Sequence, residues 1–172
     1  MCANLLIFVM AAGLATAPMQ VFERRVSSYA KLHRKLEAQL PRLKPTDSPE
    51  AIANHQKELA ARIQAARASA KPNEIFSPEI SAEFRRLLAN VLRGQDAKQV
   101  RQSLQHAEPV RLALRVNDLY PADLPLQSMP PTLLLQLPKL PRELDYRIAG
   151  HSLVLRDTTA NLIVDFIPDA MP

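Results

Sequence analysis

The sequence predicts an α+β protein in which several helices come first and a small antiparallel sheet closes the chain. Apolar residues recur at helical spacing in the first half, whereas the last third holds short apolar runs separated by turn residues. Proline separates these two parts, since seven of the thirty-five residues from Glu108 to Arg142 are prolines. With 172 residues, 47% of them apolar and 23% charged, the chain has the composition of a globular protein of one domain or one domain plus a small module.

The first predicted helix has an apolar stripe whose members alternate in spacing between four and three residues, which is the pattern of one helix face. The stripe consists of Phe22, Val26, Tyr29, His33, Leu36, Leu40 and Leu43. Pro41 and Pro45 are expected to end this helix, because proline removes a backbone donor and disfavours the helical conformation of the residue before it.

Two further helices are predicted from the same start signal, Ser48-Pro49-Glu50 and Ser77-Pro78-Glu79. Each places a capping serine before a proline at the first helical position and an acid in the first turn. The second helix is expected to form an antiparallel hairpin with the first, through Ile52, Leu59, Ile63 and Ala66. The third helix is expected to run to Gly94 with an apolar face of Ile80, Phe84, Leu87, Leu88, Val91 and Leu92, followed by a short fourth helix capped by Asp96.

The C-terminal part is expected to be largely extended. Strict alternation in "VRLALRV" (110–116) predicts a half-buried strand, and "PPTLLLQL" has room for a turn or two of helix. The runs "LDYRIAG", "HSLVLRD" and "NLIVDFI" predict three short strands, with Gly150 and Asn161 at the tight connections. Asp165 is expected to share a strand face with Ile163 and Ile167, and to lie at a sheet edge or to pair with an arginine such as Arg147 or Arg156.

The N-terminal segment has an apolar run from Leu5 to Ala15, which fits the core of an export signal better than a membrane span of about twenty residues. Small residues allow cleavage after Ala15 or after Ala17. Because no Lys or Arg precedes the run, and the first charge is Glu23, an uncleaved anchor and an ordinary buried helix stay open as alternatives. The predicted organisation is a signal peptide at 1–17, a helical region at 18–107 and a proline-rich crossing with a small β-module at 108–172. The predicted location is periplasmic or secreted, with no stable membrane span after processing.

Candidate chemistry in the sequence is sparse. If the helical hairpin turns near Lys44, His33 and His55 lie at similar heights on facing helices, so two imidazoles could share a divalent metal ion, with Glu37 or Glu58 as a third ligand. A packed histidine that bonds to a neighbour is the alternative for each of them. His106 with Glu108 offers a base and its orienting acid, but no nucleophile motif accompanies them. We therefore expect no catalytic residues and no cofactor.

The charge is distributed unevenly along the chain. The segment from Pro18 to Ala107 contains sixteen Lys and Arg and nine Asp and Glu, a net charge of +7. The segment from Glu108 to Pro172 contains six Lys and Arg and eight Asp and Glu, a net charge of −2. The basic residues of the first part are interspersed with acids, as on a solvated helix face. All four aromatics of the helical part, Phe22, Tyr29, Phe76 and Phe84, fall on apolar stripes, so no nucleic acid is expected as a partner.

The segment "LPKLPRELDYRIAGHSLVLRDTTANLIVDFIP" resembles the C-terminal β-module of bacterial periplasmic proteins related to the nickel/cobalt-homeostasis regulator family. Shared features are a Leu-Pro-rich lead-in, an aromatic strand, an aliphatic strand ending in Asp and a final aliphatic strand. Asn161 stands where that family usually has glycine. The whole chain also resembles a group of uncharacterised secreted bacterial proteins with helices followed by strands. These resemblances imply a periplasmic location and a β-meander, and they identify no catalytic residue.

Together these observations favour an exported, non-catalytic protein that acts as an interaction or structural module of the cell envelope, with an envelope protein or surface as its partner. The alternative is a periplasmic protein that binds a divalent metal through His33 and His55 and serves metal homeostasis.

Overall fold

The computed structural model describes residues 16–43, 45, 47–94, 97–98, 113–121 and 129–171. Three long helices come first, followed by a one-turn helix and three strands that form an antiparallel sheet in the order β1-β2-β3. The elements are α1 (Ala17–Glu37), α2 (Pro49–Ala66), α3 (Pro78–Arg93), α5 (Pro131–Leu134), β1 (Leu144–Ala149), β2 (Ser152–Asp157) and β3 (Ile163–Ile167). The predicted α+β class is confirmed.

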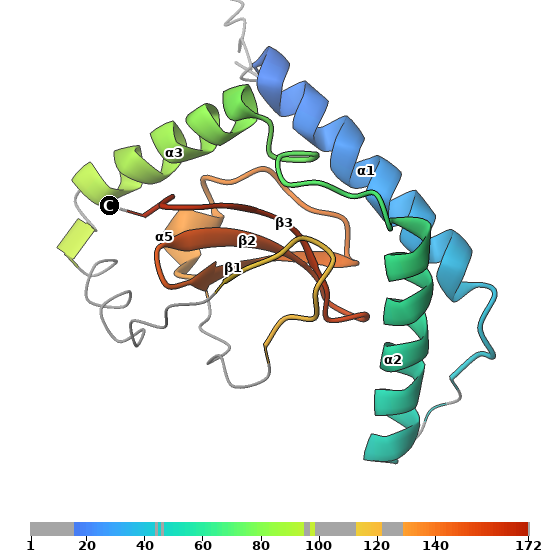
Figure 1. The fold of residues 1–172 in the computed structure, drawn as a ribbon. Coiled ribbons are helices and arrows are strands. Elements are labelled where there is room, and N and C mark those ends of the chain that lie inside the picture. The colour runs from blue at the N-terminus through green and yellow to red at the C-terminus, as the bar shows by residue number, and fades with distance from the viewer. Residues whose placement is uncertain are drawn as a thin grey trace, which may run out of the picture.

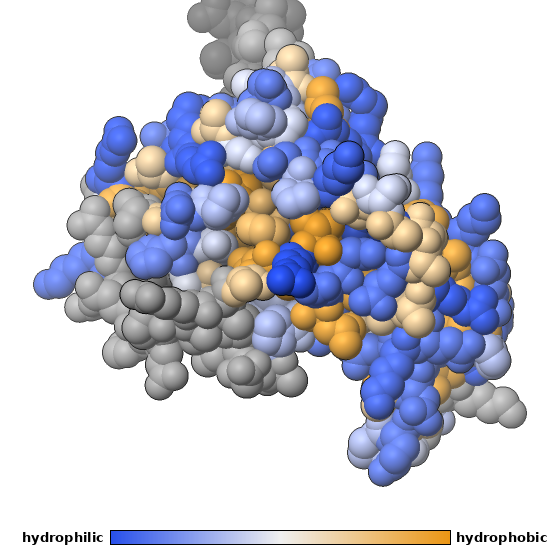
Figure 2. Space-filling view, viewed as in Figure 1, coloured by the Kyte–Doolittle hydropathy of each residue, from blue (hydrophilic) through white to orange (hydrophobic). Residues whose placement is uncertain are grey.

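The helices α1 and α3 cover one face of the sheet, and α2 lies beside it (Figure 1). One hydrophobic core joins α1, α2, α3 and all three strands, so the helices and the sheet bury their apolar side chains against each other. Hydrophilic side chains cover the outer surfaces of the helices, whereas apolar ones gather over the sheet (Figure 2). The helical part and the β-module therefore share one interior.

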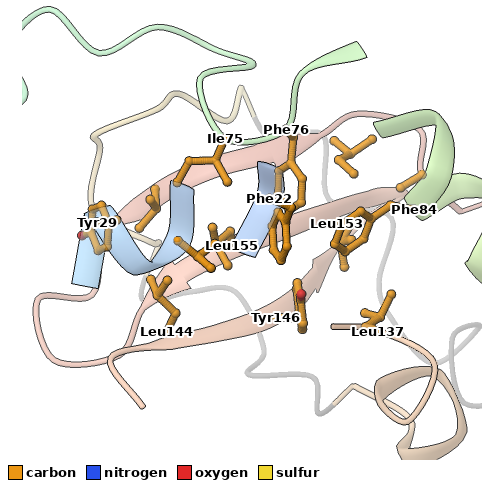
Figure 3. Close-up of a cluster of buried hydrophobic side chains, with 14 of the residues drawn as sticks. Phe22, Tyr29, Ile75, Phe76, Phe84, Leu137, Leu144, Tyr146, Leu153 and Leu155 are labelled. Carbon is orange, nitrogen blue, oxygen red and sulfur yellow. The ribbon is translucent and has the colours of Figure 1, made fainter. Parts of the chain in front are cut away.

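Three phenylalanines form the centre of this core (Figure 3). Phe22 of α1 lies with its ring centroid 4.9 Å from that of Phe84 of α3 and 5.6 Å from that of Phe76 in the preceding loop. Tyr146 of β1 approaches Phe84 at 5.9 Å from the side of the sheet. All three phenylalanines are fully buried, and stacked and edge-to-face contacts of this kind add to the stabilisation from burial.

The predicted helix starts are confirmed, although Ser77 makes no side-chain capping hydrogen bond, and one predicted end needs correction. Pro49 and Pro78 each stand at the beginning of a helix, and the Ser48 hydroxyl accepts a hydrogen bond from the Ala51 N–H. The first helix ends at Glu37 and continues as a turn to Leu40, because the residues before Pro41 leave the helical conformation. Leu43, the last member of the predicted stripe, is 43% exposed.

In the predicted hairpin of α1 and α2, only the C-terminal half of α2 is packed against the core. Leu59 and Ile63 are fully buried, whereas Ile52 is 48% exposed and Ala66 is exposed. The C-terminal half of α2 packs against the core while its N-terminal half extends away from α1 (Figure 1). The expected burial of Ile52 against α1 is therefore wrong, because this half of α2 diverges from α1, and the expected burial of Ala66 is wrong because this residue is exposed at the last position of the helix.

Residues 113–116 do not form the predicted strand, and the part of that prediction at 110–112 lies outside the described residues. Instead, Asn117 adopts a left-handed backbone with φ of 74° and its side-chain amide donates to the Gln64 and Arg67 carbonyls at the end of α2. The chain turns here to cap that helix. From Asn117 the chain also runs antiparallel to the start of β3, where the Asn117 N–H donates to the Ile163 carbonyl, the Ile163 N–H donates to the Asp118 carbonyl, and Leu119 and Leu162 form an isolated bridge.

The other predicted C-terminal elements are confirmed. α5 forms within "PPTLLLQL", and the three strands occupy the three predicted runs. Gly150 and Asn161 both have positive φ values, 58° and 52°, at the tight connections. The second face of the sheet carries a smaller cluster of Tyr120, Ala149, Val154 and Ile163.

A bulge in β3 changes the environment of Asp165. Leu155 pairs with Asp165 but Arg156 pairs with Ile163, so Val164 is an extra residue. Because of this insertion, Ile163 joins the smaller cluster while Ile167 lies in the main core, and the expectation that Asp165 shares a face with both is wrong. Asp165 does lie on an edge strand, as expected.

Asp165 is fully buried, and its partners are backbone amides rather than an arginine. Oδ2 accepts hydrogen bonds from the Ile75 and Phe76 N–H groups at 2.8 and 2.9 Å, and Oδ1 accepts from those of Asn73 and Phe166. Arg147 and Arg156 instead share Asp145. The Asp165 carboxylate thus fixes the loop between α2 and α3 to β3 and orients Phe76 for the aromatic cluster.

Several predictions concern residues outside the described ranges. These are the apolar run from Leu5 to Ala15, most of the short fourth helix after Asp96, and the boundary between 107 and 108. Met19 is the first buried residue of the described chain, and it lies after both predicted cleavage positions. No helix within the described residues is long and apolar enough to cross a membrane.

We predict that Asp165→Asn lowers the free energy of unfolding by about 2–3 kcal/mol, because an amide nitrogen replaces an oxygen that accepts buried N–H groups. Urea denaturation followed by circular dichroism measures this loss. Asp118→Asn is the matched control, since Asp118 is exposed and its substitution should change stability by less than about 0.5 kcal/mol. Equal stabilities of the two variants would contradict the role given to Asp165.

Candidate functional site

The most closely connected set of ionisable side chains surrounds Asp157, the last residue of β2. This carboxylate is fully buried beneath α1. Its Oδ2 accepts a hydrogen bond from the Tyr29 hydroxyl at 2.8 Å and lies 2.6 Å from His33 Nδ1. Its Oδ1 accepts from the Thr159 and Ala160 N–H groups of the turn that follows. One carboxylate therefore joins two residues of α1 to the loop between β2 and β3.

His33 lies between two acids. Its side chain is 1% exposed, and its Nε2 is 3.5 Å from a Glu37 carboxylate oxygen one helical turn further along α1. Burial by itself lowers the pKa of His33, but the hydrogen bond and charge of Asp157, aided by Glu37 and Glu143, outweigh it, so the pKa is raised above its ordinary value. Burial and the neighbouring Asp157 charge raise the pKa of Tyr29, so its phenol keeps its proton.

Glu143 extends the set at the start of β1. Its side chain is 4% exposed, and Oε1 accepts hydrogen bonds from Arg34 of α1 at 3.0 Å and from Arg142 at 3.2 Å. Burial favours the neutral acid, but the backbone and these two arginines outweigh it and hold the pKa of Glu143 below its ordinary value. The two arginines, and His33 when it carries a proton, thus offset the negative charge of Asp157, Glu37 and Glu143.

This geometry indicates that His33 has a structural role and that its protonation affects the stability of the fold. Both ring nitrogens face carboxylates, and the ring itself is almost inaccessible. A proton on His33 strengthens its hydrogen bond to Asp157, so the stability of the fold is coupled to pH. The sequence contains a weak signal for this pair: Asp157 shares a strand face with the core residues Leu153 and Leu155. No local pattern connects it with a helix 124 residues earlier.

The two histidines predicted to share a metal have different environments. His33 is buried and bonded to Asp157, which agrees with the alternative of a packed histidine. His55 is partly exposed, on the half of α2 that extends away from α1 (Figure 1). Among the described residues, no three or more His, Cys, Asp and Glu side chains are grouped so as to hold a metal ion. The site formed by His33 and His55 alone stays a prediction.

The other predicted residues add no further group to this site. His106 and Glu108 lie outside the described residues, and His151 is an exposed turn residue whose carbonyl accepts the Met171 N–H. Phe22, Phe76 and Phe84 are buried in the core, and Tyr29 is buried beside Asp157, as the apolar stripes predict.

A groove beside β1 is the clearest surface hollow near exposed apolar side chains. It has a volume of about 560 Å³, and one wall is formed by residues 144–147 of β1. The opposite wall comprises Met129, Leu134, Leu137, Pro138, Lys139 and Leu140. We call this hollow the edge groove. Leu134 and the adjacent Leu135 are 49% and 81% exposed.

No family model, curated protein or solved structure matches this chain in a comparison with known proteins.

We predict that the stability of the protein falls as the pH rises through the folded-state pKa of His33. The pKa is raised on folding, so the stabilisation is complete below the unfolded value of about 6.5 and is lost progressively as the pH rises from there through the folded-state pKa. Urea midpoints measured between about pH 6 and pH 9 should decline in the natural protein and show less decline in His33→Gln. The exposed His151→Gln serves as the control. An unchanged slope in His33→Gln would show that His33 does not carry the effect.

Proposed function

We propose that this protein is an exported, non-catalytic interaction module of the cell envelope, and that its edge groove receives an extended apolar segment of a partner protein. The observation that carries the proposal is the position of the groove, which follows the outer edge of β1 next to two exposed leucines. Export rests on the apolar run from Leu5 to Ala15.

The backbone of β1 supports this mode of binding. The Thr158 N–H donates a hydrogen bond to the Glu143 carbonyl. In an antiparallel pair this means that every second residue of the strand, counted from Glu143, directs its N–H and C=O groups toward β2. The intervening residues, Tyr146 and Ile148, then direct their N–H and C=O groups to the outer edge. No backbone hydrogen bond from the other described residues reaches these groups. An extended peptide can add to such an edge as a further strand.

The opposite wall of the groove supplies apolar contacts. The Tyr146 hydroxyl donates to the Pro138 carbonyl at 3.0 Å and so holds the Leu-Pro-rich segment beside the strand. Exposed leucines next to a strand edge are typical of interaction sites, since burying them against a partner removes apolar surface from water. At the polar end of the groove, Asp145 pairs with both Arg147 and Arg156. An apolar segment with few charges is the partner that these walls suit best.

We predict that cell fractionation finds the protein in the soluble periplasmic or secreted fraction, with an intact mass that lacks about fifteen to seventeen residues. Met19 is the first buried residue, so removal of either predicted length leaves the described core complete. An uncut product in the membrane fraction would identify the segment as an anchor. An uncut product in the cytosol would contradict export.

We predict that a photo-crosslinking amino acid in place of Leu135 captures a segment of another envelope protein in the native host. The matched control carries the same group at Ile52, which is 48% exposed but lies on α2, away from the groove. Mass spectrometry should find a product specific to position 135, with one apolar stretch of the partner attached. A product containing two copies of this chain, or identical products from both positions, would contradict the proposed partner.

A further inference from the structure

A second hollow lies between α1 and the loop that joins α2 to α3, and it shares no lining residue with the edge groove. It has a volume of about 590 Å³. Three arginines line it, Arg24 and Arg25 from α1 and Arg67 from the end of α2, together with Glu74 as the one acid. We call it the arginine hollow. Tyr29 and Ile75 also line it, and both belong to the main core (Figure 3).

Arg67 is the key residue because it is held in place and yet incompletely bonded. Its side chain is 8% exposed, and its Nη2 donates to the Val164 carbonyl at 3.1 Å and to Glu74 at 3.2 Å. The guanidinium carbon lies 5.2 Å from the centre of the Tyr29 ring, which stabilises the charge. Its Nη1 is buried without any hydrogen-bond partner. A buried charged donor without an acceptor is costly, so an acceptor that reached this atom from the hollow would be stabilised.

The surrounding charges favour an anion. Arg24 and Arg25 are absent from the ion pairs of the described residues, and Arg25 donates only to the Ile75 carbonyl, at 3.1 Å. Glu74 is 52% exposed and already bonded to Arg67. The lining thus holds three arginines and one acid, and outside it Glu79 at the start of α3 lies near enough for the charge of Arg25 to help lower its pKa. Guanidinium groups bind carboxylate and phosphate oxygens through paired N–H donors, and arginine keeps its charge at any physiological pH.

The remaining lining limits the size and nature of the ligand. Val21 and Leu32 of α1 and Ile75 of the loop contribute apolar side chains, and the exposed Ser28 belongs to the same wall. We propose that the arginine hollow binds a small anionic molecule in which a carboxylate or phosphate group is attached to a short apolar body. The anionic group lies against Arg67 and Arg24, and the apolar body lies along α1.

Isothermal titration calorimetry at low ionic strength tests this proposal with hexanoate and inorganic phosphate as probes and 1-hexanol as the neutral analogue. We expect saturable binding of hexanoate, of phosphate or of both, and none of 1-hexanol. Binding of hexanoate but not of phosphate would identify a carboxylate as the preferred group. Binding of phosphate but not of hexanoate would identify a phosphate group. Loss of binding on addition of salt is expected, because the attraction is largely electrostatic.

Two variants locate the site. Arg24→Gln removes an exposed charge at the hollow and should weaken binding about tenfold, and Arg67→Lys keeps the charge but removes the free Nη1 and should weaken binding at least as much. Arg93→Gln makes the same charge change as Arg24→Gln on an exposed residue of α3 outside the hollow, and should bind like the natural protein. If Arg67→Lys fails to fold, Arg24→Gln and Arg93→Gln decide the question. No saturable binding of either anion, or equal weakening in Arg24→Gln and Arg93→Gln, would overturn the proposal.

Discussion

The Asp157 carboxylate is the interaction on which the rest of this structure depends. It is the last residue of the central strand, and it is buried beneath the first helix without contact with water. A carboxylate in that position is tolerated only if its oxygens are fully bonded, and four donors meet this requirement. Two of these donors hold α1 in place and two shape the turn into β3, so the helix and the hairpin fix each other's positions.

Asp165 makes the same arrangement on the neighbouring strand with a different set of donors. There the N–H groups belong mainly to the loop before α3, and the bulge at Val164 brings the carboxylate to them. Two adjacent strands therefore each present one buried acid to the helical layer. Apolar packing around Phe22, Phe76 and Phe84 supplies most of the burial, whereas the two acids restrict which helix and loop positions are compatible with it.

Local patterns were sufficient to predict most of the elements. Ser-Pro-Glu starts, the stripe from Phe22 to Leu40 and the left-handed Gly150 and Asn161 all depend on neighbours a few residues away. Contacts between distant segments were not predictable in this way. Ile52 is exposed because α2 diverges from α1, and residues 113–116 are not a strand because Asn117 caps α2. His33 was recognised as a candidate residue, but its partner Asp157 lies 124 residues away, and the free Nη1 of Arg67 depends on the packing of three segments.

The long separation between partners in the sequence has a consequence for how the chain folds. Tyr29 and His33 bond to a residue 128 and 124 positions later, and Phe22 packs in a core completed by β1, β2 and β3. The helices can form early, but much of their apolar surface has nothing to cover it until β1, β2 and β3 have left the ribosome. Closing such large loops costs entropy before any contact compensates it, so folding is expected to be slow. During synthesis the chain therefore stays open, with its helices formed and its interior still accessible to chaperones.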